Sequence, residues 1–182
     1  WCLALQALGY RLSEHVIDAA DCGVPQNRRR LFVVGMRNRK PLPESLRPTT
    51  PHVPIASVLD FSAGKWSPIE KPGRAAASLR RIEAGRRLYG PRFVCPYYSL
   101  GSGITGRSLD RPLGTVTTIS RWALVDGDRM RMLTVEELRA AMGFHAGYRL
   151  APSKRDSEKL LGNAVAPPCA EFLVRQVAER VA

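Results

Sequence analysis

The sequence predicts an α/β protein in which a small, irregular β-rich region separates an α/β segment from a helical C-terminal part. Three observations lead to this prediction. The first forty residues have the order helix, strand, turn, strand; the middle of the chain is rich in proline and glycine; and the last third carries helical spacing with capping residues. The chain has 182 residues, enough for one domain or two small ones.

The first forty residues are expected to be the end of an α/β sheet. Residues 3–8 have apolar side chains at helical spacing and stop at Gly9, and residues 10–19 are expected to form a strand. Glycine and proline indicate a turn at 21–25. Residues 31–35, Leu-Phe-Val-Val-Gly, are an apolar run typical of a buried strand. These elements are too few to stand alone, because the apolar strand needs neighbours.

The middle of the chain is expected to be irregular at first and then to form short strands. Seven prolines between residues 41 and 72 indicate a linker without long helices or strands. Residues 92–125 alternate in short β-like pieces, such as 115–119, and predict a small, strongly bent β region. A short basic helix is expected at 75–88, with four exposed arginines: Arg80, Arg81, Arg86 and Arg87.

The last third of the chain is expected to be helical. Thr134 is a good N-cap, and Glu137 three residues on completes a capping box, so a helix should run over 135–142 and end at Gly143. A second helix is expected at 170–181, after two prolines. Its apolar stripe consists of Phe172, Leu173, Val177 and Val181.

The composition is strongly basic, with a formal net charge of +12 from 28 Lys and Arg against 16 Asp and Glu. This charge favours an anionic partner, most commonly nucleic acid, although charge alone does not exclude a merely solvated basic surface.

No apolar run is long enough to cross a bilayer, and the N-terminus lacks the basic region of a signal peptide, so no membrane association is expected. Because the chain begins with Trp1, it is expected to start inside a longer one or to have been processed or trimmed.

The cysteines predict a reducing environment. They form no CxxC pair, so free thiols in a cytoplasmic protein are expected, with no zinc or other metal site. The four positions are Cys2, Cys22, Cys95 and Cys169.

The most informative motif lies between the two expected strands. Residues 25–30 are Pro-Gln-Asn-Arg-Arg-Arg. Arginines at the end of a strand can hydrogen-bond to phosphate oxygens or to a base edge. A solvated basic turn is the alternative. Residues 20–35 resemble the Gln-x-Arg-x-Arg motif of the DNA cytosine-5 methyltransferases. The resemblance implies that Arg30 contacts the flipped cytosine near O2, that Arg28 contacts backbone and organises the pocket, and that Gln26 is a third DNA-binding position.

Two further segments resemble blocks of the same family, in the family's order. Residues 111–127 resemble the end of its target-recognition domain, with Thr-Val where Thr-Leu is usual, which implies a backbone contact for Thr115 near the flipped nucleotide. Residues 131–144 match the Arg-x-Leu-x-x-x-Glu-x-x-x-x-Met-Gly-Phe block that orders this domain. We expect Arg131 and Glu137 of that block to make polar contacts.

A fourth block is expected on the cofactor side. Residues 161–165, Leu-Gly-Asn-Ala-Val, resemble the family's Gly-Asn-Ala-Val block, which closes the S-adenosylmethionine site and implies Asn163 and Ala164 as cofactor-binding residues. A glycine-bearing loop that opens a helix can offer N–H groups to a ligand, and a helix N-terminus capped by Asn163 is the alternative. The sequence departs from the family at Leu160, where Gln is usual, and at Ala166, where Pro would follow Val directly.

The resemblance implies the C-terminal part of a Rossmann-like, S-adenosylmethionine-dependent DNA methyltransferase of the restriction–modification kind. Residues 1–44 would end the catalytic domain, residues 45–128 would form the target-recognition domain, and residues 129–182 would return to the catalytic domain. The family's Phe-x-Gly-x-Gly, Pro-Cys-Gln and Glu-Asn-Val blocks are missing, so no cysteine is assigned as the nucleophile.

Activity is therefore expected to need a further part. The chain is expected to bind double-stranded DNA, to hold only part of the S-adenosylmethionine site, and to be inactive without an N-terminal methyltransferase half. A split-enzyme subunit, a fragment and a degenerate remnant fit equally well. A stand-alone DNA-binding module without catalysis is the alternative function, and RNA binding is weaker because no RNA-recognition signature occurs.

Overall fold

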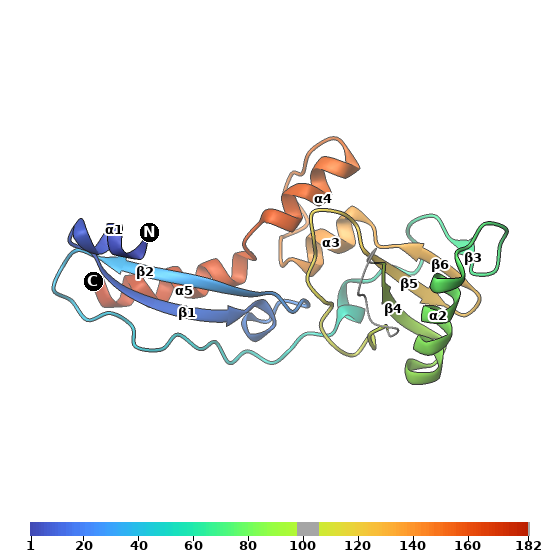
Figure 1. Ribbon diagram of the computed structural model, residues 1–182, viewed down its shortest axis with the longest axis horizontal. Helices are drawn as coiled ribbons and strands as arrows, with labels where there is room; N and C mark the ends of the chain where they lie inside the picture. Colours follow the sequence, from blue (N-terminus) through green and yellow to red (C-terminus); the bar gives the residue numbers. More distant parts are fainter. Residues whose placement is uncertain (98–105, 182) are drawn as a thin grey trace.

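The computed structural model of the chain describes residues 1–97 and 106–181. Figure 1 shows an elongated molecule with a long β-hairpin at one end and a second, mixed part at the other. The hairpin end carries four elements: α1 (Cys2–Ala7), β1 (Arg11–Asp18), β2 (Arg29–Met36) and α5 (Pro167–Val181). The other end contains a four-stranded sheet with α2 (Ala76–Tyr89) beside it, and α3 (Val135–Ala141) and α4 (Lys154–Asn163) lie toward the middle.

The hairpin confirms the two strands expected near the N-terminus. β1 pairs antiparallel with β2 in a register that runs from Arg11 opposite Met36 to Asp18 opposite Arg29. The preceding helix ends before Gly9, whose φ of 83° lies in the left-handed region that glycine adopts without strain.

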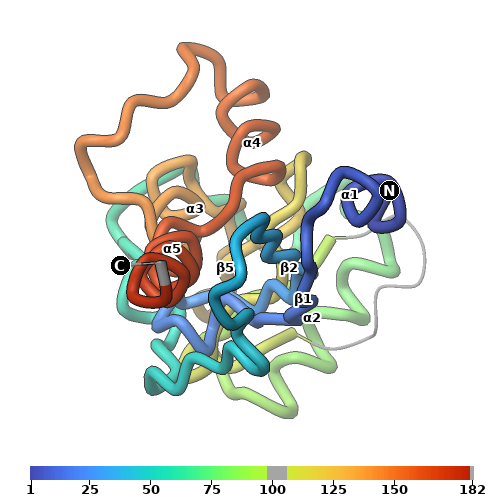
Figure 2. Tube along the Cα trace, turned by 90° about the vertical axis from the view of Figure 1, so that its left-hand side faces the viewer, coloured from blue at the N-terminus to red at the C-terminus, as the bar shows by residue number. Residues whose placement is uncertain are grey.

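Only one face of the hairpin is buried. Ile17, Val34 and Met36 pack in a cluster with the apolar stripe of α5, which runs alongside the hairpin in both views (Figures 1 and 2). On the opposite face Val16 is 59% exposed and Leu31 56%. Residues 31–35, which resemble a buried strand in sequence, do form a strand, but only one of its faces is buried, because an antiparallel pair covered by one helix leaves its other face to solvent.

The proline-rich linker is irregular, as predicted. Between β2 and α2 it contains only the short 3-10 helix η2 (Ile55–Val58) and the two-residue strand β3 (Ser67–Pro68). Its first half runs along the hairpin, where Leu46 is buried against Ile17 and Val34.

The sheet at the other end has the strand order β3-β6-β5-β4, and all neighbours are antiparallel. The three longer strands are β4 (Arg92–Pro96), β5 (Trp122–Asp126) and β6 (Arg129–Met132). Side chains alternate between two apolar clusters, one for each face. Phe93 and Val125 pack with Ile82 of α2, whereas Val94 and Leu124 belong to the cluster that contains α3 and the end of α4.

Three details of the middle region differ from expectation. Residues 115–119 are not a strand; they form an extended segment without ladder pairing, whose hydrogen bonds go to other parts of the chain. Part of the predicted β region, residues 98–105, lies outside the described residues. Of the four arginines on α2, Arg80 and Arg87 are exposed, but Arg81 and Arg86 are half-buried.

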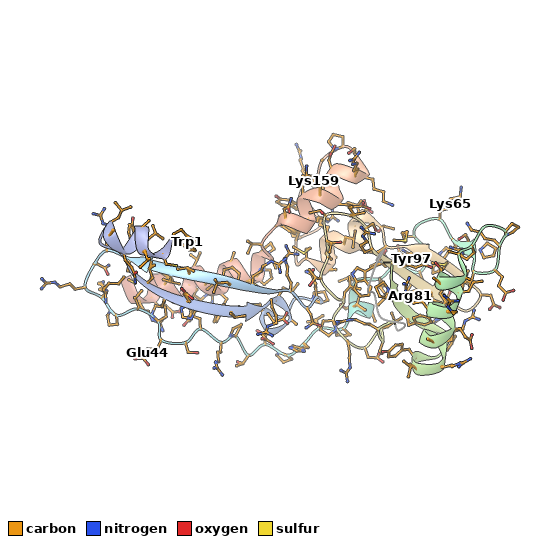
Figure 3. All side chains as sticks on the ribbon, viewed as in Figure 1. Trp1, Glu44, Lys65, Arg81, Tyr97 and Lys159 are labelled. Atoms are coloured by element: carbon orange, nitrogen blue, oxygen red, sulfur yellow. The ribbon has the colours of Figure 1, made fainter. Side chains whose placement is uncertain are left out.

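The two half-buried arginines of α2 are held by the sheet. The Arg81 guanidinium lies 5.7 Å from the centre of the Tyr97 ring, and Figure 3 shows the two side chains together. Arg86 donates hydrogen bonds to the Gly127 carbonyl and to Asp128. Packing of α2 on β4 therefore directs part of its basic surface toward the sheet.

The C-terminal helices follow their local signals closely. The Thr134 hydroxyl accepts a hydrogen bond from the Glu137 N–H at 3.2 Å, and the Glu137 carboxylate accepts one from the Thr134 N–H at 2.8 Å, which confirms the capping box. α3 ends before Gly143, with a φ of 78°. α5 begins at Pro167, three residues earlier than expected, because proline is well suited to the first turn of a helix, where its missing N–H has no partner to lose. Its stripe residues Phe172, Leu173 and Val177 pack on the hairpin; the Val181 side chain lies outside the described residues.

Candidate functional site

The candidate site forms where the turn between β1 and β2 meets the end of the sheet region. Asp18, the last residue of β1, shapes this turn: its Oδ1 accepts hydrogen bonds from the Arg28 N–H at 2.7 Å and from the Ala20 N–H at 3.2 Å. The 3-10 helix η1 (Ala19–Cys22) fills the turn and ends at Gly23, with a φ of 76°. Sequence reasoning missed Asp18, although an aspartate at a strand end followed by a tight turn is a usable signal.

The turn is joined to residues 113–116 by backbone and side-chain hydrogen bonds. The Leu113 N–H donates to the Pro25 carbonyl at 2.9 Å, and the Asn27 N–H donates to the Leu113 carbonyl at 2.7 Å. Gln26 is fully buried; its Oε1 accepts from the Val116 N–H at 2.5 Å, and its Nε2 lies 2.8 Å from the Met142 sulfur. The extended segment thus satisfies its polar groups with the turn instead of a neighbouring strand.

Arg28 connects three parts of the chain. Its side chain is only 5% exposed, and its two terminal nitrogens donate to the Val116 carbonyl at 2.9 Å and to the Gly162 carbonyl at 2.7 Å. Burial, and secondly the nearby Arg30 charge, lowers the pKa of the Arg28 guanidinium, but arginine stays protonated at neutral pH because its ordinary pKa is so high. Arg28 therefore supplies a buried positive charge that holds two backbone carbonyls together.

Arg30 has a different environment. It lies on β2 opposite Ile17, is exposed, and its side chain donates to the carbonyl of Arg29 at 2.8 Å. Thr115 is half-buried, and its hydroxyl donates to the Asn27 carbonyl at 3.0 Å. The structure thus brings Gln26, Arg28 and Thr115 into one hydrogen-bonded group, with the exposed Arg30 charge close by.

The Gly-Asn-Ala-Val block lies at a helix end, not at a helix start. α4 is capped at its N-terminus by Ser153 and ends with Asn163, and Ala164 is already extended, with φ −71° and ψ 156°. The interpretation of this block as a loop that opens a helix, with Asn163 as its N-cap, is therefore wrong. Asn163 is exposed and Ala164 is half-buried.

Gly162 links this block to the rest of the site. Its carbonyl is one of the last in α4, which have no partner within the helix, and it accepts from Arg28. A Cβ at this position would overlap the backbone of Thr117 and Thr118, so only glycine permits the helix end to approach the extended segment so closely. The sequence offered no signal for this role beyond the glycine itself.

Close to this group, a buried ion pair orders the sheet and α3. The Arg131 and Glu137 side chains are 1% and 3% exposed and form two hydrogen bonds, at 2.6 and 2.7 Å. Glu137 also accepts from the N–H of Asp60, and Arg131 donates to the Asp60 carbonyl. The Trp66 ring lies 5.0 Å from the Arg131 guanidinium. The expectation of polar contacts for these two residues is confirmed: they contact each other.

Within 1–97 and 106–181, no cluster of three or more histidine, cysteine, aspartate or glutamate side chains could hold a metal ion. None of the helices in that part of the chain is long and apolar enough to cross a membrane. All four cysteines are free thiols, as predicted.

Comparison with known proteins places this arrangement in a family. The family described as C-5 cytosine-specific DNA methylase matches residues 1–71 and 92–179, so the gap falls mainly on α2. The type II methyltransferase M.AplI of Arthrospira platensis is 30% identical over 177 residues, which cover 95% of this chain and 49% of the relative. M.MspI of a Moraxella species is 25% identical over 97% of this chain and 39% of its own length. The chain thus spans about half the length, or less, of these relatives.

Solved structures are similar in fold. The methyltransferase EhMeth of Entamoeba histolytica aligns with a TM-score of 0.61 and 13% identity, over 100% of this chain and 57% of that one. The Dnmt2 methyltransferase of S. pombe aligns with a TM-score of 0.62 and 15% identity, over 99% of this chain and 61% of that one. At these identities the likeness is one of fold, and it confirms the predicted class: an α/β methyltransferase fold of which this chain covers a part.

Proposed function

Since this chain belongs to the C-5 cytosine-specific DNA methylases, we propose that it is the DNA-recognition and C-terminal part of a DNA cytosine-5 methyltransferase. The complete enzyme would transfer a methyl group from S-adenosylmethionine to C5 of cytosine in a specific sequence of double-stranded DNA, within a restriction–modification system. The observation that carries the proposal is the Arg28 joint, defined as the Arg28 side chain with the Val116 and Gly162 carbonyls. It connects the proposed DNA side directly to the proposed cofactor side.

On the DNA side, we assign the base contact to Arg30. Its guanidinium is exposed, so it can reach a nucleotide by giving up its hydrogen bond to the adjacent Arg29 carbonyl. Gln26 and Arg28 are buried, and their side-chain groups already bind the protein, so both act as positioning residues that organise the pocket. Thr115 is half-buried on the same surface and would contact the DNA backbone nearby.

On the cofactor side, a family of methyltransferases implies S-adenosylmethionine as the methyl donor. Asn163 and Ala164 fit a role at the rim of that site, because both retain exposed surface at the C-terminal end of α4. The Asn163 amide can donate and accept hydrogen bonds, as polar groups of the cofactor require. We propose that this chain supplies one side of the cofactor site and that the remainder comes from the N-terminal half.

The division into three parts fits this assignment. Residues 1–44 and 129–182 would belong to the catalytic domain, and residues 45–128 would form the target-recognition domain. The sheet crosses the second boundary, because β6 (Arg129–Met132) pairs with β3 and β5, so β6 would complete the sheet of the target-recognition domain. The open face of the hairpin would contact the N-terminal half, because large apolar side chains are exposed there and on the adjacent α1. These exposed side chains are Trp1, Leu3, Leu8, Val16 and Leu31.

The experiment compares the purified chain with and without the complementary N-terminal half of a family member. With labelled S-adenosylmethionine and double-stranded DNA, we expect no methyl transfer by this chain alone and transfer after the halves are combined. Transfer by the chain alone would contradict the proposed incompleteness. Sequence-specific binding without cofactor, combined with a failure of complementation, would favour a stand-alone DNA-binding module.

A pair of matched variants tests the assignment of Arg30. Arg29 and Arg30 are adjacent, both exposed and on opposite faces of β2, so Arg30→Gln and Arg29→Gln remove the same charge from the same strand. In the complemented enzyme, we expect Arg30→Gln to reduce kcat/KM for DNA by at least tenfold and Arg29→Gln to have a smaller effect. Equal effects would mean that only the overall charge matters, as for non-specific phosphate binding.

A further inference from the structure

Two of the four thiols meet although they lie far apart in the sequence. Cys22 is the last residue of η1, and Cys169 lies in the first turn of α5. They belong to one small apolar cluster, with Ala19, Val24 and Ala166, that packs η1 against α5.

The two thiols of this pair have different access to solvent. Cys169 is 3% exposed, whereas Cys22 is half-buried and lines a cavity of about 260 Å³ between the linker and α5. The other walls of this cavity include Thr50, Phe172 and Arg175. Of the two cysteines, Cys22 is therefore the one that a small, uncharged oxidant can reach from this cavity.

The pKa values of the two thiols shift in opposite directions. The Cys169 thiol donates to the Cys22 sulfur, which lowers the pKa of Cys22, although burial and the nearby Asp21 and Asp18 charges oppose this effect. The same hydrogen bond, together with burial, raises the pKa of Cys169. The thiolate is the reactive form of cysteine, so Cys22 is the nucleophile of the pair.

The other two cysteines provide a contrast. Cys95 is fully buried between the sheet and α2, and burial raises its pKa to about 11. Cys2 is half-buried, and its sulfur lies 3.7 Å from the Glu14 carboxylate and not beside a second thiol. An accessible thiol whose pKa is lowered and which packs beside a second thiol is the arrangement found in redox-sensitive cysteines, and Cys22 has it.

We propose that Cys22 and Cys169 are a peroxide-sensitive site that closes reversibly to a disulfide. The Cys22 thiolate attacks one oxygen of hydrogen peroxide; the O–O bond breaks, a sulfenic acid forms and water leaves after protonation. The Cys169 sulfur then attacks the Cys22 sulfur, the S–O bond breaks and a second water leaves with the Cys169 proton. Each thiol has lost one hydrogen, and peroxide has been reduced to water.

The disulfide would lock together the two halves of the candidate site. η1 leads directly into Gln26 and Arg28, and α5 directly follows the segment that contains Asn163 and Ala164. Under the proposed function, oxidation would therefore join the DNA side to the cofactor side covalently. The chemistry of the pair does not depend on that function, and the experiment reads the cross-link alone.

The experiment maps the cross-link in the folded chain. The protein is treated with hydrogen peroxide, free thiols are blocked with N-ethylmaleimide, and the denatured protein is digested with trypsin without reductant. Cleavage after Arg11, Arg28, Lys159 and Arg175 leaves Cys22 in peptide 12–28 and Cys169 in peptide 160–175. We expect these two peptides to appear joined, lighter by two hydrogens than their sum, and to separate after dithiothreitol; free thiols should fall by two per chain.

Variants distinguish the pair from general oxidation. Cys22→Ser and Cys169→Ala should each abolish the joined peptides, and circular dichroism should verify that both variants remain folded. In Cys169→Ala, Cys22 should accumulate as a sulfenic acid that dimedone traps. Cys2→Ser, as matched control, should leave the cross-link unchanged. Oxidation of Cys2 as fast as Cys22, or of Cys22 without any joined peptide, would overturn the proposal.

Discussion

Because the Arg28 joint connects the hairpin to the sheet region, we predict that Arg28→Met lowers the free energy of unfolding and weakens the coupling between these two regions. Methionine has a similar length and fills the same buried space, so the substitution removes the charge and the donors with little change in packing. Two buried carbonyls, those of Val116 and Gly162, lose a charged donor. The substitution therefore tests hydrogen bonding at the joint and not the volume of the core.

The expected loss of stability follows from these two bonds. A hydrogen bond to a charged group contributes about 1.5–3 kcal/mol, and an unsatisfied buried acceptor costs about 1–3 kcal/mol. Removing the buried guanidinium also removes its unfavourable desolvation, which offsets part of the lost stability. We therefore expect a net loss of about 3 kcal/mol, large for a single substitution.

Urea unfolding followed by fluorescence and circular dichroism measures this loss. Trp122 is a suitable reporter, because it is buried and its indole N–H donates to the Thr115 carbonyl beside the joint. Arg30→Met is the matched control: the same change at an exposed arginine should cost less than about 0.5 kcal/mol. Arg28→Lys should fall between the two, since a compact ammonium cannot reproduce the fork of a guanidinium.

The comparison of Arg28→Met with Arg30→Met tests whether Arg28 holds the joint. If Arg28→Met and Arg30→Met lose the same stability, Arg28 does not hold the joint, and its assignment as the organiser of the pocket fails. If instead Arg28→Met shows two separate transitions where the parent chain shows one, the joint is the element that couples the hairpin to the sheet region.

Three further predictions concern the surroundings of the site. Glu137→Gln leaves the Arg131 charge buried without its counter-charge, so urea unfolding should reveal a loss of about 3–5 kcal/mol, and a loss below 1 kcal/mol would contradict a desolvated pair. Gly162→Ala forces a methyl group against the backbone of Thr117 and Thr118 and should lower the free energy of unfolding by about 1–3 kcal/mol or more. The control Gly147→Ala, where the nearest neighbour of a Cβ is 3.4 Å away, should be nearly neutral. Equal losses in the two variants would mean that the end of α4 can shift freely. In the folded chain the pKa of Cys95 is about 11, against an ordinary 9.0, so between these pH values the folded chain keeps a proton that the unfolded chain loses. Urea unfolding measured across this range should therefore show the parent losing about 2–3 kcal/mol more stability than Cys95→Ala. Parallel curves of stability against pH would show that the thiol ionises equally in both states.

Local signals made several elements predictable from the amino acids. The capping box of Thr134 and Glu137, the glycine stops at Gly9 and Gly143, and the hairpin each depend on residues that are close together in the chain. Ordered motifs also indicated the family, because a motif keeps its residues at set spacings whatever their surroundings. In each case the information lies within a short stretch of sequence, and the fold did not have to be known to read it.

Contacts between distant segments decided the rest. Arg28 and Arg30 are two residues apart and chemically identical, yet one is buried by Val116 and Gly162 and the other faces solvent. The sequence could not separate them, because the difference comes from segments about 90 and 130 residues further along. The same reason explains why residues 115–119 look like a strand but instead hydrogen-bond to the turn.

The motif that first indicated a DNA-binding protein therefore divides into two roles. Its residue types and spacing were sufficient to predict a basic group at a strand end and to suggest a family. Which arginine is buried against distant carbonyls, which one remains exposed, and which of four scattered cysteines pack in one cluster were determined only in three dimensions. Burial and hydrogen-bond partners depend on what the folded chain brings alongside each residue, and composition and spacing do not contain that information.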